Sequence, residues 1–430
     1  MKEIFRLGSL RGRINMPPDK SIAHRSALFA AIADGESVIR NYSKAADPQT
    51  TLDCLRRLGV SVSQDGDTVT ILGVGRDGLV APEPELDCGN SGTTVRLLTG
   101  ILAGAGVETR IIGDDSLSVR PMKRVLGPLS SMGLRYEARE GNFLPLQLNG
   151  SEHGKLNAIR YELPIPSAQV KSCVLLAGLF TEEPTQVVET VLSRDHTERL
   201  LNVEITETST GRILSTSRKT VIPLQNYAVP GDFSAAAFWL VAGSIYPDSE
   251  IKLMNVGVNP TRTAALDILL RMGADIQIHP HSTTSGEPVA DITVRTAALH
   301  STEIHPEEVP NCIDELPILS VAMSFAQGKS QFLGAEELRH KESDRLAAVA
   351  AMLKVAGVEF EEHPDGLSIT GNPGFVPKGA SYESLHDHRI AMSAGILAGL
   401  SREHSVVNDS ECTAISYPSF WEDLDQVSNP

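Results

Sequence analysis

The chain has 430 residues, 41% of them hydrophobic and 21% charged, which is the composition of an ordinary globular protein. A single hydrophobic core rarely serves a chain of this length, so we expect two domains of about 200 residues each. The formal net charge of −16 argues against non-specific binding to nucleic acid or to an anionic membrane, because both require a basic surface. Any positively charged binding site must therefore be confined to a small part of the surface.

The cysteines and the N-terminus indicate a cellular compartment. Five cysteines are scattered without a Cys-x-x-Cys pair, so they predict neither a disulfide framework nor a zinc site. The first residues, "MKEIFRLGSLRGRINMPP", lack the apolar run of a signal peptide. No stretch reaches the roughly 18 apolar residues that a membrane span needs. We therefore expect a reducing, cytoplasmic location.

In chain order, Ala- and Leu-rich segments that predict buried helices alternate with amphipathic segments that predict a second type of helix. The first type occupies 21–35, 93–106, 168–180, 233–246, 316–328 and 387–400. The second type begins the stretches 51–62, 123–137, 197–207, 266–278 and 345–361. Hairpin-like runs such as "DGDTVTIL" and "HPDGLSIT" follow most of the second type. The pattern predicts about six copies of a unit of about 70 residues, three per domain, with helices enclosed by sheets.

Polar residues stand immediately before the predicted buried helices, in "PPDKS", "DCGNSGT", "IPSAQ", "VPGDFS", "NCIDE" and "LHDHR". The N-terminus of a helix favours an anion, because it offers free N–H groups and a partial positive charge. If the repeats stack in register, these ends share a surface with a set of basic side chains. The set is Lys20, Arg25, Arg120, Arg194, Lys341, Arg345 and Arg389. Each motif taken alone is better explained by helix N-caps and solvated cations, whereas six coordinated occurrences predict a site for polyanionic ligands.

Other motifs give weaker indications of a functional site. "GVGRDG" at 73–78 matches a dinucleotide-binding glycine pattern, but the prolines after it preclude the helix that such a site needs. Ser91 in "CGNSGTT" does not satisfy the Gly-x-Ser-x-Gly pattern of a hydrolase nucleophile. His386 and His388 lack an obvious third metal ligand, so a capping and hydrogen-bonding role is favoured over a metal site. The phosphate-binding loop motif of P-loop kinases does not occur.

A resemblance to a known family is carried by seven segments. They are "PPDKSIAHR", "GNSGTTVRLL", "DDSLSVRPMKRV", "PSAQVKS", "DELPIL", "KESDRL" and "DHRIAM". In their order and spacing the chain resembles the 5-enolpyruvylshikimate-3-phosphate (EPSP) synthase family over essentially its whole length. The resemblance implies an α/β, two-domain enolpyruvyl transferase-like fold, each domain with three βαβαββ repeats whose helices are enclosed by sheets. It places one domain at 19–229, the other at 1–18 with 230–430, and the active site in the cleft between them.

The resemblance also implies the reaction. The enolpyruvyl group of phosphoenolpyruvate passes to the 5-hydroxyl of shikimate 3-phosphate through a tetrahedral intermediate, and phosphate is released, as a step of aromatic amino acid biosynthesis. No cofactor or metal is implied, and no nucleic-acid or membrane partner, and we expect a monomer. Because cations of both domains must converge on small ligands, we also expect the domains to close on substrate binding.

The family's site residues can be transferred motif by motif. The resemblance assigns the binding of shikimate 3-phosphate to Lys20, Ser21, Arg25, Ser167, Gln169, Asp314 and Lys341. It assigns the binding of phosphoenolpyruvate to Lys20, Asn90, Gly92, Arg120, Gln169, Arg345 and Arg389. Asp314 would take the hydroxyl proton, Glu342 would protonate the methylene carbon and Lys20 would polarise the developing charge. Lys341 and Arg345 keep Glu342 ionised unless bound phosphoenolpyruvate offsets them. The bare sequence favours Asp314 as a helix N-cap, and the resemblance reverses that preference.

Some positions depart from one branch of the family. Ala168 replaces a second serine, and Ile415 stands where that branch has a lysine for phosphoenolpyruvate. "SRDHTERL" places Arg194 and His196 near the shikimate phosphate instead. We expect glyphosate, the family's inhibitor, to compete with phosphoenolpyruvate, because Gly92 leaves room for the longer molecule.

Two alternative functions remain at this point. The sister transferases that act on UDP-N-acetylglucosamine use a cysteine on the loop before an Arg-Pro pair, and here that loop reads "DDSLSVRP". A non-catalytic scaffold that binds phosphorylated ligands would need neither Asp314 nor Glu342. A turnover assay separates the enzyme from the scaffold.

Overall fold

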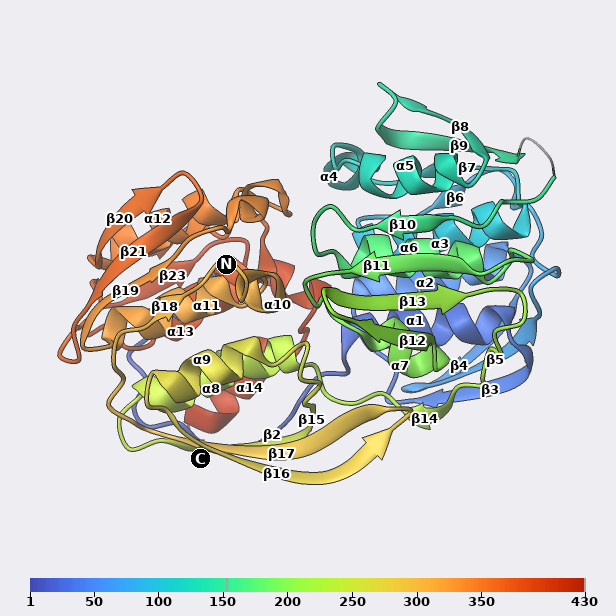
Figure 1. The fold of residues 1–430 in the computed structure, drawn as a ribbon. Helices are drawn as coiled ribbons and strands as arrows, with labels where there is room; N and C mark the ends of the chain where they lie inside the picture. The colour runs from blue at the N-terminus through green and yellow to red at the C-terminus, as the bar shows by residue number, and fades with distance from the viewer. Residues whose placement is uncertain (152–153, 429–430) are drawn as a thin grey trace. The chain divides into compact units, whose positions relative to one another are not determined.

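The computed structural model describes residues 1–151 and 154–428. The chain forms two compact units, drawn in Figure 1. Unit 1 comprises Met1–Pro17, Pro230–Thr283 and Pro288–Pro430, and unit 2 comprises Pro18–Val229 and Thr284–Glu287. Pro18 and the short segment Thr284–Glu287 are the parts that the division expected from the sequence assigns to the other unit.

Unit 2 contains three four-stranded sheets of one topology, in which a parallel pair is extended by two antiparallel strands. The first sheet runs β14 (Asn226–Ala228), β3 (Asp34–Arg40), β5 (Thr68–Val74) and β4 (Ser61–Asp65). The second runs β6 (Leu86–Asp87), β7 (Thr109–Ile112), β9 (Phe143–Ser151) and β8 (Leu134–Arg139). The third runs β10 (Arg160–Glu162), β11 (Thr185–Glu189), β13 (Gly211–Thr216) and β12 (Glu204–Thr208). The repetition follows from the repeated sequence pattern.

Three helices of unit 2, α1 (Lys20–Ile32), α3 (Gly92–Ala105) and α6 (Ala168–Gly178), are buried along nearly their whole length. Figure 1 shows α3 and α6 side by side among the sheets. The helices α2 (Ala46–Arg57), α5 (Lys123–Ser131) and α7 (His196–Leu201) follow them in the chain, and α4 (Asp115–Ser118) is a single turn. The two helix types predicted for this half of the chain are thus confirmed.

Unit 1 repeats the pattern with changes. One sheet runs β16 (Asp275–Thr284), β17 (Glu287–Arg295), β15 (Glu250–Gly257) and β2 (Arg11–Asn15). The next runs β18 (Glu303–Ile304), β19 (Gly328–Phe332), β21 (Gly366–Gly371) and β20 (Glu359–His363). The last has three strands, β1 (Lys2–Ile4), β23 (Ser405–Val407) and β22 (Ser381–Tyr382). The sixth repeat therefore departs from the predicted pattern, because its third strand comes from the start of the chain.

The buried helices of unit 1 are α8 (Phe233–Ile245), α11 (Leu316–Phe325) and α13 (His388–Ala398). The remaining helices are α9 (Ala264–Arg271), α10 (Val309–Cys312), α12 (Arg345–Ala356) and α14 (Phe420–Ser428), with 3-10 helices η1 (Glu336–His340) and η2 (Ser410–Ile415). In the sixth repeat η2 stands where the other repeats have their second α-helix. This agrees with the sequence, which shows only five amphipathic segments.

Two strands are exchanged at the crossings between the units. β2 comes before α1 in the chain, yet it pairs in parallel with β15 of unit 1. β14 comes before α8, yet it pairs in parallel with β3 of unit 2. β2 therefore belongs to unit 1, although the next helix in the chain, α1, lies in unit 2. Likewise β14 belongs to unit 2, although the next helix, α8, lies in unit 1. Local sequence patterns carry no sign of this exchange.

Five of the six buried helices are capped by a side chain that accepts a hydrogen bond from a backbone N–H of the first turn. The caps are Asp19 on α1, Ser91 on α3, Ser167 on α6, Asp232 on α8 and Asp387 on α13. The sixth helix, α11, begins after Glu315, whose side chain makes no cap bond. The capping role considered for the polar motifs is therefore confirmed at five helices, and the residues next to the caps lie in the first turns.

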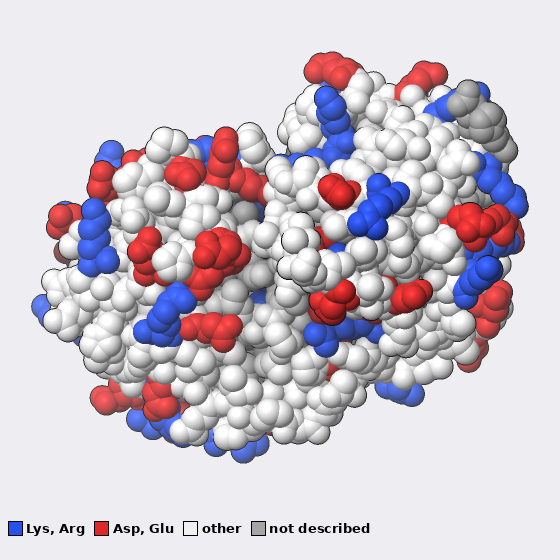
Figure 2. Space-filling model, in the orientation of Figure 1, with Lys and Arg blue, Asp and Glu red and all other residues white. Residues whose placement is uncertain are grey.

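No helix of the described residues is long and apolar enough to cross a membrane. On the face drawn in Figure 2, basic and acidic side chains are interspersed, and neither sign covers a broad area. The five cysteines are buried free thiols.

Glycines at corresponding strand ends in the two units allow close approach of a buried helix. A Cβ at Gly73, in β5, would lie 2.2 Å from the carbonyl oxygen of Ala33, at the end of α1. A Cβ at Gly371, in β21, would lie 2.2 Å from the carbonyl oxygen of Met323, near the end of α11. Backbone atoms cannot turn aside as a side chain can, so only glycine fits at either place.

Gly73→Ala is therefore expected to lower the free energy of unfolding of unit 2 by about 1–3 kcal/mol, the usual cost of overpacking. Gly127→Ala in α5 is the matched control, because its added methyl would meet no atom within 4 Å; its effect should stay within about 0.5 kcal/mol. Urea denaturation of the two variants measures the difference. Equal stability of the two would contradict the close approach at Gly73.

Candidate active site

The first turns of α1 in unit 2 carry three of the expected substrate ligands. Lys20 is the first helical residue, and its Nζ lies 2.6 Å from Asp47 Oδ2 of α2. Ser21 follows it and accepts a hydrogen bond at its carbonyl oxygen from Arg25. Asp47 thus balances the charge of Lys20, a partner that the sequence did not reveal.

Arg25 is buried, and each of its three side-chain nitrogens donates a hydrogen bond. Its Nε donates to Thr197 Oγ1 at 2.8 Å, and its two terminal nitrogens donate to Ser21 O and Ser172 Oγ, each at 3.0 Å. Burial lowers the pKa of Arg25 to about 10, and the charge of Arg194 acts in the same direction. The charge of Arg194 thus acts on Arg25 against the charges of Glu198 and Asp19, which raise its pKa.

The loop before α3 holds Arg120. The Asn90 side chain accepts a hydrogen bond from Arg120 at 2.8 Å and donates one to Asp114 at 2.7 Å. Ser116 Oγ accepts a further bond from Arg120 at 3.0 Å. Asn90 therefore fixes the guanidinium of Arg120.

Gly92, Arg96 and Gln169 meet at the first turns of α3 and α6. A Cβ at Gly92 would lie 2.9 Å from an Arg96 nitrogen and 3.5 Å from an Arg120 nitrogen. Arg96 donates to Gln169 Oε1 at 2.9 Å, and Gln169 donates to Thr93 Oγ1 at 3.3 Å. The sequence analysis missed Arg96, although it is a lone charge one turn after Gly92 in an otherwise apolar helix.

A buried hydrogen-bond chain ties these helix starts together. His24 Nδ1 lies 2.6 Å from Thr51 Oγ1, Thr51 Oγ1 lies 2.7 Å from Thr94 Oγ1, and Thr94 donates to Ser91 Oγ at 2.7 Å. Burial holds the pKa of His24 well below its ordinary value, and Lys20 and Arg25 lower it further. The hydroxyl of Ser91 is thus occupied as the cap of α3. Ser167 is likewise occupied, because its Oγ accepts from the N–H of Val170 as the cap of α6.

In unit 1 the centre of the expected site is Arg345, whose side chain is 1% exposed. Its Nε donates to Asp387 Oδ2 at 2.7 Å, and its terminal nitrogens contact Asp314 Oδ1 at 3.3 Å and Glu342 Oε2 at 2.5 Å. Burial opposes its charge, but Asp387, Glu342 and Asp314 together raise the pKa of Arg345 above its ordinary value. Arg345 is therefore a permanent cation held by three carboxylates.

Asp314 lies between α10 and α11 and does not cap either helix, because the N-cap of α11 is Glu315. Its carboxylate lies 3.8 Å from Lys341 Nζ as well as 3.3 Å from Arg345. Its carbonyl oxygen accepts a hydrogen bond from Arg389 at 2.9 Å. The N-cap alternative for Asp314 is thus wrong, and the carboxylate stands between two cations.

Arg389, in the first turn of α13, is held by groups that the sequence analysis did not single out. One of its terminal nitrogens donates to Ser234 Oγ at 2.5 Å and lies 3.6 Å from Glu315 Oε1. Glu315 is fully buried, and both of its oxygens accept from Arg262 at 3.0 Å. Arg262 and Glu315 lie in the polar stretches "NPTRT" and "NCIDE" before helices, and this position is the sequence feature that could have identified them.

The remaining sequence candidates lie elsewhere in unit 1. Ile415 ends η2 and packs, partly buried, against the core of unit 1. His386 is exposed, and His388 is the buried first residue of α13. Among the residues that the structure describes, no group of three or more His, Cys, Asp or Glu could hold a metal ion.

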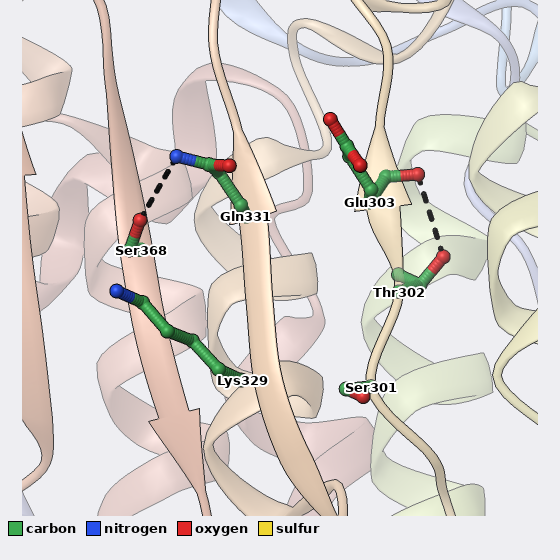
Figure 3. A pocket seen from close by; sticks show the side chains of 6 residues that line it. All are labelled: Ser301, Thr302, Glu303, Lys329, Gln331 and Ser368. Atoms are coloured by element: carbon green, nitrogen blue, oxygen red, sulfur yellow. Dashed lines mark hydrogen bonds between the residues drawn. The ribbon is translucent and has the colours of Figure 1, made fainter.

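A cavity of about 350 Å³ lies on the sheet that contains β18, β19 and β21. Figure 3 shows its lining, in which Gln331 donates to Ser368 Oγ at 3.1 Å and Lys329 extends beside them. The six lining residues include none of the expected substrate ligands. This cavity is therefore separate from the candidate site.

The repeated α/β sheets and the cationic helix starts define an enolpyruvyl transferase fold. The structure superposes with a TM-score of 0.77 on the enolpyruvyl transferase NikO from Streptomyces tendae, at 17% identity and covering 99% of this chain and 96% of that one. At that identity the likeness establishes the fold alone.

The sequence comparisons identify the family. A model of EPSP synthase (3-phosphoshikimate 1-carboxyvinyltransferase) matches residues 6–424. The chain is 46% identical to a 3-phosphoshikimate 1-carboxyvinyltransferase of Salinibacter ruber, covering 100% of this chain and 99% of the relative. The enzyme of that name from Bacillus velezensis is 44% identical, with 98% of each chain covered. An EPSP synthase structure from Acinetobacter baumannii has a TM-score of 0.87 at 37% identity, covering 99% of this chain and 97% of that one.

The chain therefore belongs to the EPSP synthase family, and it is a transferase of the shikimate pathway. It transfers the enolpyruvyl group of phosphoenolpyruvate to the 5-hydroxyl of shikimate 3-phosphate. The reaction expected from the motifs is thus confirmed, and the alternatives of a UDP-N-acetylglucosamine enzyme and of a scaffold are set aside.

The buried pair of Asp387 and Arg345 makes stability depend on pH. Burial alone would raise the pKa of Asp387, but the charge of Arg345 outweighs it and holds the pKa below its ordinary value. A carboxylate of this kind adds stability above its unfolded pKa and loses it as the pH falls through its folded pKa. We expect Asp387→Asn to lower the free energy of unfolding at pH 7 by about 3 kcal/mol, and the deficit to shrink below about pH 4.

Asp344→Asn is the matched control for that prediction. Asp344 caps α12 directly before Arg345 and is 42% exposed, and asparagine is an equally good cap, so its replacement should change stability little. Urea denaturation of both variants at pH 7 and pH 3 measures the effect. A deficit of Asp387→Asn that stays constant over this range would exclude the charge of Asp387 as its cause.

Proposed function

We propose that the cationic groups of the two units act on the same pair of substrates and that Asp314 and Glu342 transfer the protons. The observation that supports this most strongly is the place of Asp314: a carboxylate outside both helix caps, 3.3 Å from Arg345 and 3.8 Å from Lys341. Both substrates are anionic, and the cations gather locally in a chain whose net charge is −16.

Shikimate 3-phosphate is bound, in this proposal, by the side chains that the motifs indicate. They are Lys20, Ser21, Arg25, Ser167, Gln169, Asp314 and Lys341. Arg194 supplies a further cation near Arg25, which offsets the hydroxyl that Ala168 lacks. Arg96 orients Gln169 through its 2.9 Å hydrogen bond.

Phosphoenolpyruvate is bound by a second set, which shares two members with the first. It consists of Lys20, Asn90, Gly92, Arg120, Gln169, Arg345 and Arg389. Asn90 acts by holding Arg120, and Ser234 with Glu315 holds Arg389. Ile415 supplies no charge, so the arginines carry the binding of this anion.

The chemistry has an addition and an elimination. Asp314 accepts the proton of the 5-hydroxyl as its oxygen bonds to the substituted carbon of phosphoenolpyruvate, while Glu342 gives a proton to the methylene carbon. Glu342, now a carboxylate, then removes a methyl proton from the tetrahedral adduct, and phosphate leaves with the proton held by Asp314, which restores the double bond. Glu342 Oε2 lies 2.5 Å from a terminal nitrogen of Arg345. Bound phosphoenolpyruvate brings negative charge to Arg345, which favours the protonated form of Glu342. Lys20 stabilises the developing negative charge.

Release of phosphate from phosphoenolpyruvate is the assay for the proposed roles, and it should require shikimate 3-phosphate, with no release when UDP-N-acetylglucosamine replaces it. Asp314→Asn should lower kcat by roughly 100-fold to 10,000-fold, the range for loss of a general base, with little change in KM. Glu337→Gln is the matched control, because Glu337 also lies near Lys341, at 3.7 Å, and has no proposed proton to transfer. Near-normal turnover of Asp314→Asn would remove Asp314 from the mechanism.

Glyphosate tests the place of Gly92. The methyl of Gly92→Ala would lie 2.9 Å from Arg96, so the guanidinium must shift toward the ligand space or away from Gln169. We expect competitive inhibition of the parent enzyme against phosphoenolpyruvate, and a larger loss of affinity for glyphosate than for phosphoenolpyruvate in the variant, because glyphosate is longer. Inhibition constants and KM values from the phosphate assay give the ratio. An unchanged ratio would show that Gly92 does not line the phosphoenolpyruvate site.

Closure on substrate binding, a cytoplasmic location and a monomeric state stay predictions from the sequence. Solution scattering with and without both substrates measures the first, as a decrease in the radius of gyration.

A further inference from the structure

Unit 2 contains four buried charged residues that have no role in the proposed chemistry: Lys171 on α6, Glu189 on β11, Glu198 on α7 and Arg212 on β13. None of them is more than 7% exposed. Lys171 Nζ lies 2.9 Å from Glu189 Oε1 and 2.6 Å from Glu198 Oε1. Arg212 lies 2.8 Å from Glu189 Oε2 and 3.2 Å from Glu198 Oε1. This Lys171 cluster pairs two positive with two negative charges.

The Lys171 cluster holds one residue of the neighbouring loop, Ser193, by three hydrogen bonds. The N–H and Oγ of Ser193 donate to Glu189 Oε1 at 2.8 and 2.5 Å, and its carbonyl oxygen accepts from Lys171 at 3.2 Å. Residues 190–195 form neither helix nor strand, so their backbone groups depend on such anchors. The next residue is Arg194, whose positive charge contributes to lowering the pKa of Arg25.

A second link runs from the cluster to Arg25. Ser172 and Thr197 stand next to Lys171 and Glu198 in the sequence, and their hydroxyl oxygens lie 2.7 Å apart. Both hydroxyls accept hydrogen bonds from Arg25. Two adjacent interactions therefore join α6 to α7: the ion pair of Lys171 with Glu198, and the contact between the hydroxyls of Ser172 and Thr197. Arg25 donates hydrogen bonds to both of these hydroxyls.

Stability alone is a poor account of this arrangement, because apolar residues in place of a buried ion cluster are often as stable or more so. The hydrogen bonds to Ser193 instead fix the backbone next to Arg194, and those to Thr197 and Ser172 fix Arg25. We infer that the Lys171 cluster positions Arg194 and Arg25, through Ser193 and Thr197, to bind the phosphate group of shikimate 3-phosphate together. Lys171 and Glu189 are thus positioning residues that do not touch the substrate. The inference rests on the proposed function, in which Arg25 binds this substrate.

Ser193→Ala is the variant that tests the inference, because it removes one anchor and keeps every charge, whereas Lys171→Met is expected to destabilise the fold. Calorimetric titration without phosphoenolpyruvate should show about a tenfold loss of affinity for shikimate 3-phosphate, of the order of one hydrogen bond to a charged group. Affinity for shikimate, which lacks the phosphate, should change by less than about twofold. Ser193→Thr keeps the hydroxyl and should restore binding. In the phosphate assay, KM for shikimate 3-phosphate should rise while kcat and KM for phosphoenolpyruvate stay constant.

Thr216→Val is the control for a purely structural effect. Thr216 is buried in the same unit, at the end of β13, and donates to the carbonyl oxygen of Leu175 at 2.7 Å. It should lower the melting temperature as Ser193→Ala does and leave the affinity for shikimate 3-phosphate unchanged. The positioning role would be overturned if Ser193→Ala lost affinity for shikimate and for shikimate 3-phosphate equally. It would also be overturned if Thr216→Val lost as much affinity for shikimate 3-phosphate as Ser193→Ala. Failure of the parent enzyme to bind shikimate 3-phosphate would instead overturn the proposed function on which the inference rests.

Discussion

A cation that is shielded from water needs a partner at all times, because an unpaired buried charge is unfavourable by several kcal/mol. An enzyme for two anionic substrates must therefore hold its cations with its own groups before the substrates arrive. Lys20 is held by Asp47, Arg345 by three carboxylates and Arg389 by Ser234 and Glu315. The carboxylates beside these cations are thus as necessary to the site as the cations themselves.

The fold determines where such pairs can stand. The buried helices are almost wholly apolar along their length, so their first turns are the main places where they carry charge. Side chains cap five of these six helices and take up part of the hydrogen-bonding capacity of the first-turn N–H groups. In the proposed function, anion binding therefore falls mainly to side chains just after the caps, such as Lys20, Gln169 and Arg389, and less to the backbone N–H groups of the helix ends.

The sequence could predict what depends on local patterns. Apolar periodicity located both types of helix, and the motif order indicated the family, because each signal lies within a short stretch of chain. Contacts between distant segments could not be predicted. Arg25 meets Thr197 across 172 residues, and Arg345 meets Asp387 across 42. The contact of Arg96 with Gln169 and the burial of Glu315 have the same origin: many charged side chains satisfy the local rules, and only the packed fold selects among them. The places of β2 and β14 followed from the family resemblance and from no local pattern.

The three carboxylates around Arg345 differ in a way that joins binding to chemistry. The side chain of Asp387 is 0% exposed, whereas those of Asp314 and Glu342 are 15% and 24% exposed. An anion that arrives from solvent can replace only a partner that solvent reaches, so Asp387 stays paired and keeps the guanidinium in place. Asp314 and Glu342 are therefore the partners that solvent reaches, and they are also the two groups that transfer protons in the proposed mechanism. In that mechanism, phosphoenolpyruvate that binds Arg345 weakens the pairing of Arg345 with both carboxylates, which joins the binding of one substrate to the chemistry of both.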